Sequence, residues 1–210
     1  AENAIDNETS KEKAYIGALS KRYGPEALED SSARDKAFAE AMKKVAEEYP
    51  GDLDARVIYA ESLMNTTPWD YWQEGGEPKE VTKNILKTLQ DVLRQHPEHP
   101  MANHLMIHTV EAAHPEEGLE EAKRLEDLVP GAGHLVHMPA HIYIRTGDYH
   151  EATLANLRAI EADKRYREQV DASGVYRLAY MPHNYHFGWA TATLEGDSEL
   201  ATRLAMKMSE

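Results

Sequence analysis

Cysteine is absent from the 210-residue chain. Its absence excludes disulfide bonds, thiolate metal sites and a cysteine nucleophile. It does not fix the compartment, because a chain without thiols suits both oxidising and reducing surroundings. Apolar runs that approach the roughly 20 residues of a membrane span are also absent, so we expect no transmembrane helix.

Basic residues are scarce relative to acidic ones. The chain has 23 Lys and Arg against 37 Asp and Glu, a net charge of −14 with histidine neutral. Nucleic-acid binding needs clustered Lys and Arg, so this balance argues against nucleic acid as a partner. An acidic surface instead attracts cations.

Phenylalanine is rare, with 2 residues, whereas histidine and tyrosine are abundant, with 11 each. The histidines are also unevenly placed, because the first of them is His96. We therefore expect any histidine-based site to lie in the second half of the chain.

Helical spacing of apolar residues recurs along the whole chain, and Ser, Gly and Pro mark the segment ends. No alternating strand pattern accompanies it. The sequence therefore predicts an all-α fold of about ten helices, arranged as antiparallel helix hairpins in a single domain over residues 1–210. The expected helices are 11–23, 32–49, 53–64, 79–95, 101–113, 116–128, 133–146, 149–169, 176–195 and 198–208.

Internal repeats support the hairpin arrangement. Segments 133–163 and 183–206 each place a Gly between two helices and follow it with alanines that suit close helix contact. Segment 104–128 is a weaker copy, and 52–64 with 79–95 forms a fourth pair around an inserted loop, 65–78. We expect Trp69, Tyr71 and Trp72 of this loop to pack on the helices; the alternative is a lid over a site.

Histidines occupy equivalent positions when the repeats are aligned on their turns. Residues at i, i+3 or i+4, and i+7 share one helix face, so the pattern predicts three stripes on the first helices of successive pairs. These helices should line the concave face. The stripes are His104, His108 and Glu111; His134, His137 and His141; and His183 with His186.

Imidazoles that reach across neighbouring helices can meet at one metal ion. Imidazole with an occasional carboxylate suits Zn, Cu, Ni or Fe rather than Ca or Mg. Seven histidines and Glu111 exceed the four ligands of a tetrahedral ion, which favours a dinuclear site with Glu111 bridging or orienting ligands. The alternative is a set of polar core histidines hydrogen-bonded across the helices. Pro139 should kink the middle stripe's helix.

Four blocks of the sequence together resemble a bacterial family of tetratricopeptide-repeat (TPR) proteins. They are TPWDYW (67–72), NHLMIHTVEA (103–112), PGAGHLVHMPAHIYIRTGDYHEA (130–152) and MPHNYHFGW (181–189). The resemblance implies a TPR-like α-solenoid and carries over the eight stripe residues as the site. Members are usually longer and often exported. It therefore also implies that this chain is the N-terminal part of a longer array, and favours a periplasmic or secreted location over the cytoplasm.

No reaction is attached to the family, and no residue stands out as catalytic. The leading hypothesis is a protein that binds a transition metal (Cu, Zn or Fe) on its concave face. One alternative is a metalloenzyme, either a hydrolase or an oxidoreductase, that uses the same site. Another is a scaffold that binds a peptide or protein partner on that face, although a histidine lining favours metal over peptide.

Overall fold

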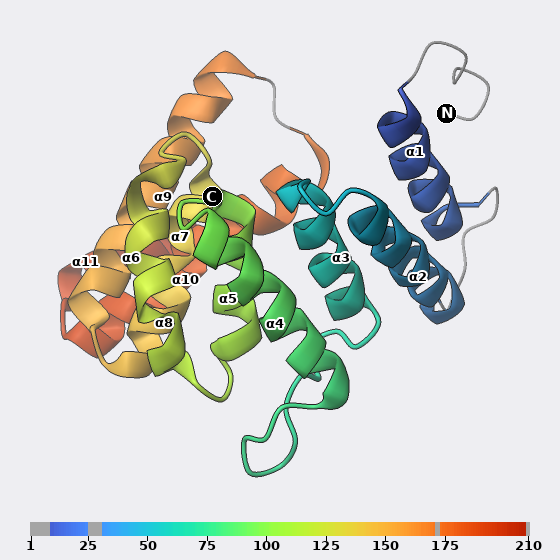
Figure 1. Cartoon of the computed structure of the whole chain (residues 1–210). Helices are drawn as coiled ribbons and strands as arrows, with labels where there is room; N and C mark the ends of the chain where they lie inside the picture. The colour runs from blue at the N-terminus through green and yellow to red at the C-terminus, as the bar shows by residue number, and fades with distance from the viewer. Residues whose placement is uncertain (1–8, 25–30, 171–172, 209–210) are drawn as a thin grey trace. The chain divides into compact units, whose positions relative to one another are not determined.

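The computed structural model describes residues 9–24, 31–170 and 173–208, and confirms the all-α fold. Within these residues the one extended pairing is an isolated bridge between Trp72 and Pro78. The chain folds into two compact units, Ala1–His96 and Pro97–Glu210 (Figure 1). None of the described helices combines the length and apolar character that a membrane crossing requires.

The first unit is a run of helices in which each packs on the next. Thr9 opens the first helix with a reciprocal capping box to Glu12, and the Asp52 side chain caps the third by accepting from the Ala55 N–H at 3.2 Å. Phe38, Met42 and Val45 supply its core. The helices are α1 (Ser10–Arg22), α2 (Ser32–Glu48), α3 (Leu53–Asn65) and α4 (Glu80–Gln95).

The inserted loop between α3 and α4 is only partly packed. Tyr71 is buried and its carbonyl accepts hydrogen bonds from Lys79 and Thr82, which ties the loop to α4. Trp69, however, is 68% exposed, so the expectation that it packs on the helices is wrong. It follows Pro68 in a turn closed by the Asp70 N–H on Thr67 O, and its φ of 61° directs its backbone into the left-handed region.

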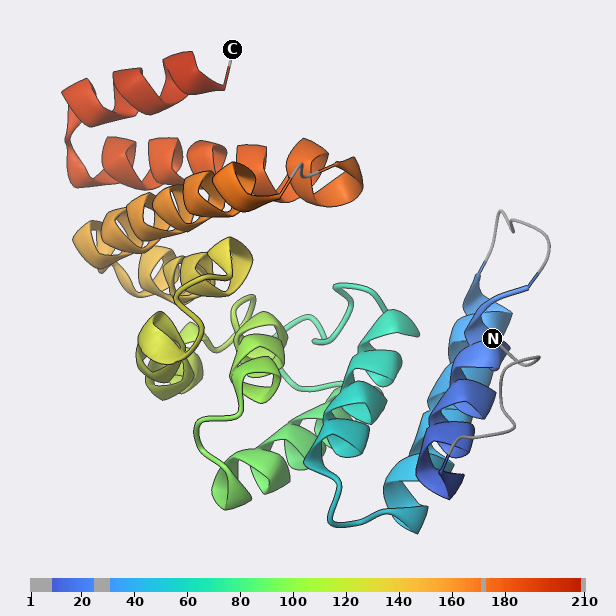
Figure 2. The same cartoon turned by 90° about the horizontal axis from the view of Figure 1, so that it is seen from above.

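The second unit continues the hairpins (Figure 2). Two expected helices, 133–146 and 176–195, are each divided in the structure, the second by a π turn at its start. The last three helices, coloured orange to red, lie side by side. The elements are α5 (Pro100–Val110), η2 (Pro115–Gly118), α6 (Leu119–Leu128), α7 (Gly133–His137), α8 (Pro139–Thr146), α9 (Tyr149–Gln169), η3 (Tyr176–Tyr180), α10 (Met181–Glu195) and α11 (Ser198–Lys207).

Glycine turns and alanine contacts hold these hairpins as the repeats predict. Gly147 ends α8 with φ 90° and Gly196 ends α10 with φ 93°, the left-handed conformation that favours glycine. Ala152, Ala155 and Ala159 of α9 are fully buried. Small side chains there let α9 approach α7 and α8 on one side and α10 on the other.

Proline 139 accounts for the break between α7 and α8. Pro139 has no N–H to bond the carbonyl four residues earlier, and the helix restarts with this residue in its first turn. The helix is interrupted at Met138, as expected for a lost backbone bond beside Pro139. α8 packs on α5 and α7 packs on α10, while both halves of this segment also pack on α6 and α9.

Candidate metal centre

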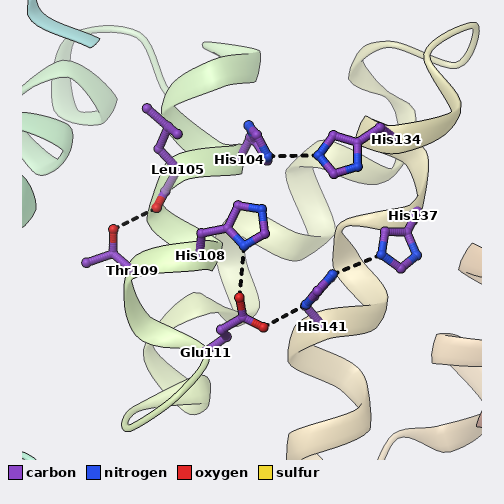
Figure 3. A network of polar contacts seen from close by, with 8 residues as sticks. All are labelled: His104, Leu105, His108, Thr109, Glu111, His134, His137 and His141. Carbon is purple, nitrogen blue, oxygen red and sulfur yellow. Dashed lines mark hydrogen bonds and ion pairs between the residues drawn. The ribbon is translucent and has the colours of Figure 1, made fainter. Parts of the chain in front are cut away.

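Histidine side chains from four helices of the second unit meet in one cluster. α5 supplies His104 and His108, α7 supplies His134 and His137, α8 supplies His141 and α10 supplies His183. The contacts of α5 with α8 and of α7 with α10 bring these helices together, as expected for the first helices of successive hairpins. Figure 3 shows the rings from α5 facing those from α7 and α8.

Glu111 lies directly after α5, and both its carboxylate oxygens are engaged. His108 Nδ1 lies 2.8 Å from Oε1, and His141 Nδ1 lies 2.6 Å from Oε2 (Figure 3). Burial alone would raise the pKa of Glu111, but the hydrogen bonds from the two rings outweigh it and lower that pKa to about 2. The ionised carboxylate can only accept, so both rings carry their protons on Nδ1. In the neutral rings the lone pair is then on Nε2.

Asn156 on α9 fixes the orientation of a third ring. Its amide nitrogen donates to Ala152 O at 2.8 Å, which leaves Oδ1 to accept from His137 Nδ1 at 2.7 Å. The neutral His137 ring therefore also carries its lone pair on Nε2. Imidazoles that ligate metals characteristically donate their other ring N–H to a carboxylate or carbonyl in this way.

Two of these lone pairs point at each other. His137 Nε2 and His141 Nε2 are 2.9 Å apart, and each ring donates its Nδ1 proton elsewhere. Two acceptors at that distance repel unless a proton or a metal cation is shared between them. The geometry is therefore suited to holding a cation.

His104 and His134 form a second close pair, with 3.2 Å between their Nε2 atoms. Their Nδ1 atoms are buried and have no hydrogen-bond partner among the described residues. Buried polar atoms normally have hydrogen-bond partners, so the contact between the two rings leaves their Nδ1 atoms unsatisfied. The His108 ring completes this group, with its centroid 4.8 Å from that of His104.

Burial favours the neutral, metal-binding form of several rings. It lowers the pKa of His104 to about 2, assisted by the neighbouring His108 and His134, and lowers the pKa of His134 to about 4. The fully buried His137 has a pKa well below its usual value for the same reason, and that of His183 is also lowered. At neutral pH these rings do not need to lose a proton before they bind a metal.

The sequence stripe on α10 differs from the observed one. His186 is exposed and stacks on Trp189 with 5.6 Å between ring centroids, apart from the cluster. Phe187 takes the inward position instead, at i+4 from His183, where it contacts the rings of His137 and His141. The structure thus brings seven of the eight expected residues together, and on α10 a spacing of four rather than three marks the inward face.

A polar network behind the rings also escaped sequence reasoning. The buried Asp163 of α9 accepts from Tyr176 Oη at 2.6 Å and from Asn184 Nδ2 at 2.8 Å. It therefore links η3 and α10 to α9. Asp163 lies against Gly133, the residue before His134. Asp163 follows Asn156 by seven residues and lies on the same face of α9. This spacing of two polar residues in an alanine-rich helix could have indicated a buried polar face.

Comparison with known proteins supports the fold and identifies no activity. No family model and no curated protein sequence matches the chain. Among solved structures, "MamA 41-end from Desulfovibrio magneticus RS-1" and a "MamA RS-1 ArsTM double mutant" are similar. Each has a TM-score of 0.65 and 11% identity, with 96% of this chain and 94% of theirs covered. MamA is an all-helical TPR-like protein, and this chain has the same type of fold.

Proposed function

We propose that the second unit binds a transition-metal ion through imidazole Nε2 atoms of the histidine cluster. The observation that carries the proposal is the set of contacts between ring Nδ1 atoms and the acceptors Glu111 and Asn156. Glu111 and Asn156 hold the Nδ1 protons of His108, His141 and His137, so that three lone pairs remain on Nε2 atoms of adjacent rings. A neutral nitrogen donor set without thiolate suits Zn, Cu or Fe. Following the family resemblance, we also propose that the protein is bacterial and exported.

Metal titration of the full chain tests the proposal. Metal-free protein is titrated with Co²⁺, whose visible bands report nitrogen coordination, and Zn²⁺ is then added as a competitor. Free metal at about 100 times its Kd stabilises the folded state by about 2.7 kcal/mol, so the unfolding temperature should rise. No spectral change and no stabilisation with either ion would refute metal binding.

Two variants locate the metal within the fold. His108→Ala combined with His141→Ala removes both rings that Glu111 orients, and should weaken binding by more than the roughly 10–100-fold that loss of an outer-shell partner costs. His186→Ala is the matched control, because this ring lies on α10 outside the cluster. Equal binding by both variants would place the metal elsewhere.

A protein-binding scaffold is the second candidate, and the TPR-like fold is equally consistent with it. Exposed apolar side chains on the last hairpin, Trp189, Leu194 and Met206, offer contact area for such a partner. In that case the histidines serve as a hydrogen-bonded core, and metal would change neither stability nor partner binding. The same titration therefore separates the two functions.

A further inference from the structure

The ligand atoms of the cluster fall into more than one group that could hold an ion. Three sets have their ligand atoms within 4.8 Å of one another, and two of the sets share no residue. One is His104, His108 and His134; the other is His137, His141 and His183. The third set, His108, Glu111 and His141, takes one ring from each.

Glu111 has a different role from the rings, because its oxygens already accept the Nδ1 protons of His108 and His141. A metal bound through the Nδ1 atoms of His108 and His141 would have to displace both hydrogen bonds. Metal on the Nε2 side keeps them, and each bond then orients its ring and raises its basicity. On this basis, and resting on the metal binding proposed above, we propose two separate three-histidine subsites coupled through Glu111.

Subsite B, which is His137, His141 and His183, should fill first. Asn156 orients the His137 ring and Glu111 orients the His141 ring. Metal binding there therefore loses little side-chain conformational entropy. In subsite A, which is His104, His108 and His134, only His108 has such an anchor. The Nδ1 atoms of the other two lack a hydrogen-bond partner among the described residues.

Charge should separate the two binding steps further. All six ligands are imidazoles, and Glu111 is a carboxylate in hydrogen-bond contact with one ring of each subsite. Because an imidazole ligand brings no negative charge, the second cation meets the repulsion of the first. We therefore expect two resolved steps with dissociation constants at least about tenfold apart, a difference of about 1.4 kcal/mol. Three ligands each also leave an open position on the metal.

Calorimetric and Co²⁺ spectroscopic titration of the full chain tests the coupling. The wild-type protein should take up two equivalents in two steps. His104→Ala should lose the weaker step and keep the tighter one, whereas His183→Ala should lose the tighter step. His186→Ala is the control and should match the wild type. Circular dichroism and a thermal scan check that each variant is folded.

Glu111→Gln supplies the sharper test of the shared residue. A Gln side chain accepts with its oxygen but donates with its nitrogen, so one of the two rings must move its proton to Nε2 and can no longer ligate. One of the two equivalents should therefore be lost or weakened by about 10–100-fold. Two equivalents with unchanged affinities in this variant would overturn the coupling.

The stoichiometry of the unmodified protein decides between the remaining outcomes. A single equivalent that either His104→Ala or His183→Ala abolishes would mean one site spanning both groups, and would overturn the inference while metal binding stands. A single equivalent that only one variant abolishes would overturn it equally. No uptake at all would refute the proposed function itself.

Discussion

Gly133, the first residue of α7, is the position at which one added methyl group should matter most. A Cβ there would lie 2.1 Å from Asp163 Oδ1 and 3.1 Å from the backbone oxygen of Ala159. The Asp163 carboxylate cannot swing aside without giving up its hydrogen bonds to Tyr176 and Asn184. The Ala159 oxygen belongs to α9, so it cannot move unless the helix does.

The expected cost of Gly133→Ala follows from these contacts. Overpacking in a close-packed interior costs typically about 1–3 kcal/mol, and a lost hydrogen bond adds about 0.5–1.5 kcal/mol. The better helix propensity of Ala returns at most about 1 kcal/mol. We therefore expect a net loss of about 2 kcal/mol. Gly131→Ala is the matched control, because nothing lies within 4 Å of a Cβ there, and should stay within about 0.5 kcal/mol of the wild type.

Urea unfolding of the metal-free chain, followed by circular dichroism, measures this difference. With a slope of about 1–3 kcal/mol per molar urea, a loss of 2 kcal/mol lowers the midpoint by about 1 M. The transition to follow is that of the second unit. Equal midpoints for Gly133→Ala and Gly131→Ala would refute the close packing of α7 on α9.

Two further predictions concern the same unit without metal. Burial raises the pKa of Asp163 above its ordinary value although Tyr176 and Asn184 oppose this, so its contribution to stability is full below about pH 4 and falls as pH rises through the folded-state pKa. The stability of Asp163→Asn relative to the wild type should therefore increase as pH rises from 4 to 8, because only the wild-type side chain titrates; urea titrations measure it. The new amide can be accommodated, because Asn184 Oδ1 has no partner among the described residues and can accept from it. A constant difference across this range would contradict the burial argument. Gly147→Ala should lower the free energy of unfolding by about 1–2 kcal/mol, because Gly147 has φ 90° and no atom within 4 Å of a Cβ, so only backbone strain acts; a variant as stable as the wild type in thermal unfolding would show that the turn relaxes.

The helices were predictable because their signals are local. Gly147 and Gly196 end helices as turn chemistry requires, and Pro139 breaks a helix where its missing N–H falls. The position of Trp69 was not predictable in this way. Trp69 lies in a turn with a positive φ, and a non-glycine residue in that conformation leaves no clear mark in the sequence.

Most histidines of the candidate site could be predicted to lie together, whereas Asn156 and Asp163, which support them, could not. Register within the repeats places His104 and His134 on facing helices, and they meet there. His186 was misplaced because spacings of three and four look alike in a sequence, whereas packing of α10 selected Phe187 for the inward position. Asn156 lies on the second helix of a hairpin, and only the packing of α9 on α7 shows which of its residues reach the rings.

The break at Pro139 has a consequence for chain length. Each added residue turns a helix by about 100°, so an insertion on either side of the break would rotate that half's histidines away from their partners. The count of residues from His134 to His141 sets the phase between the histidines of α7 and the histidine of α8. A length change in the turn at 129–132 leaves this phase intact. Insertions should therefore be tolerated in that turn and rejected between His134 and His141.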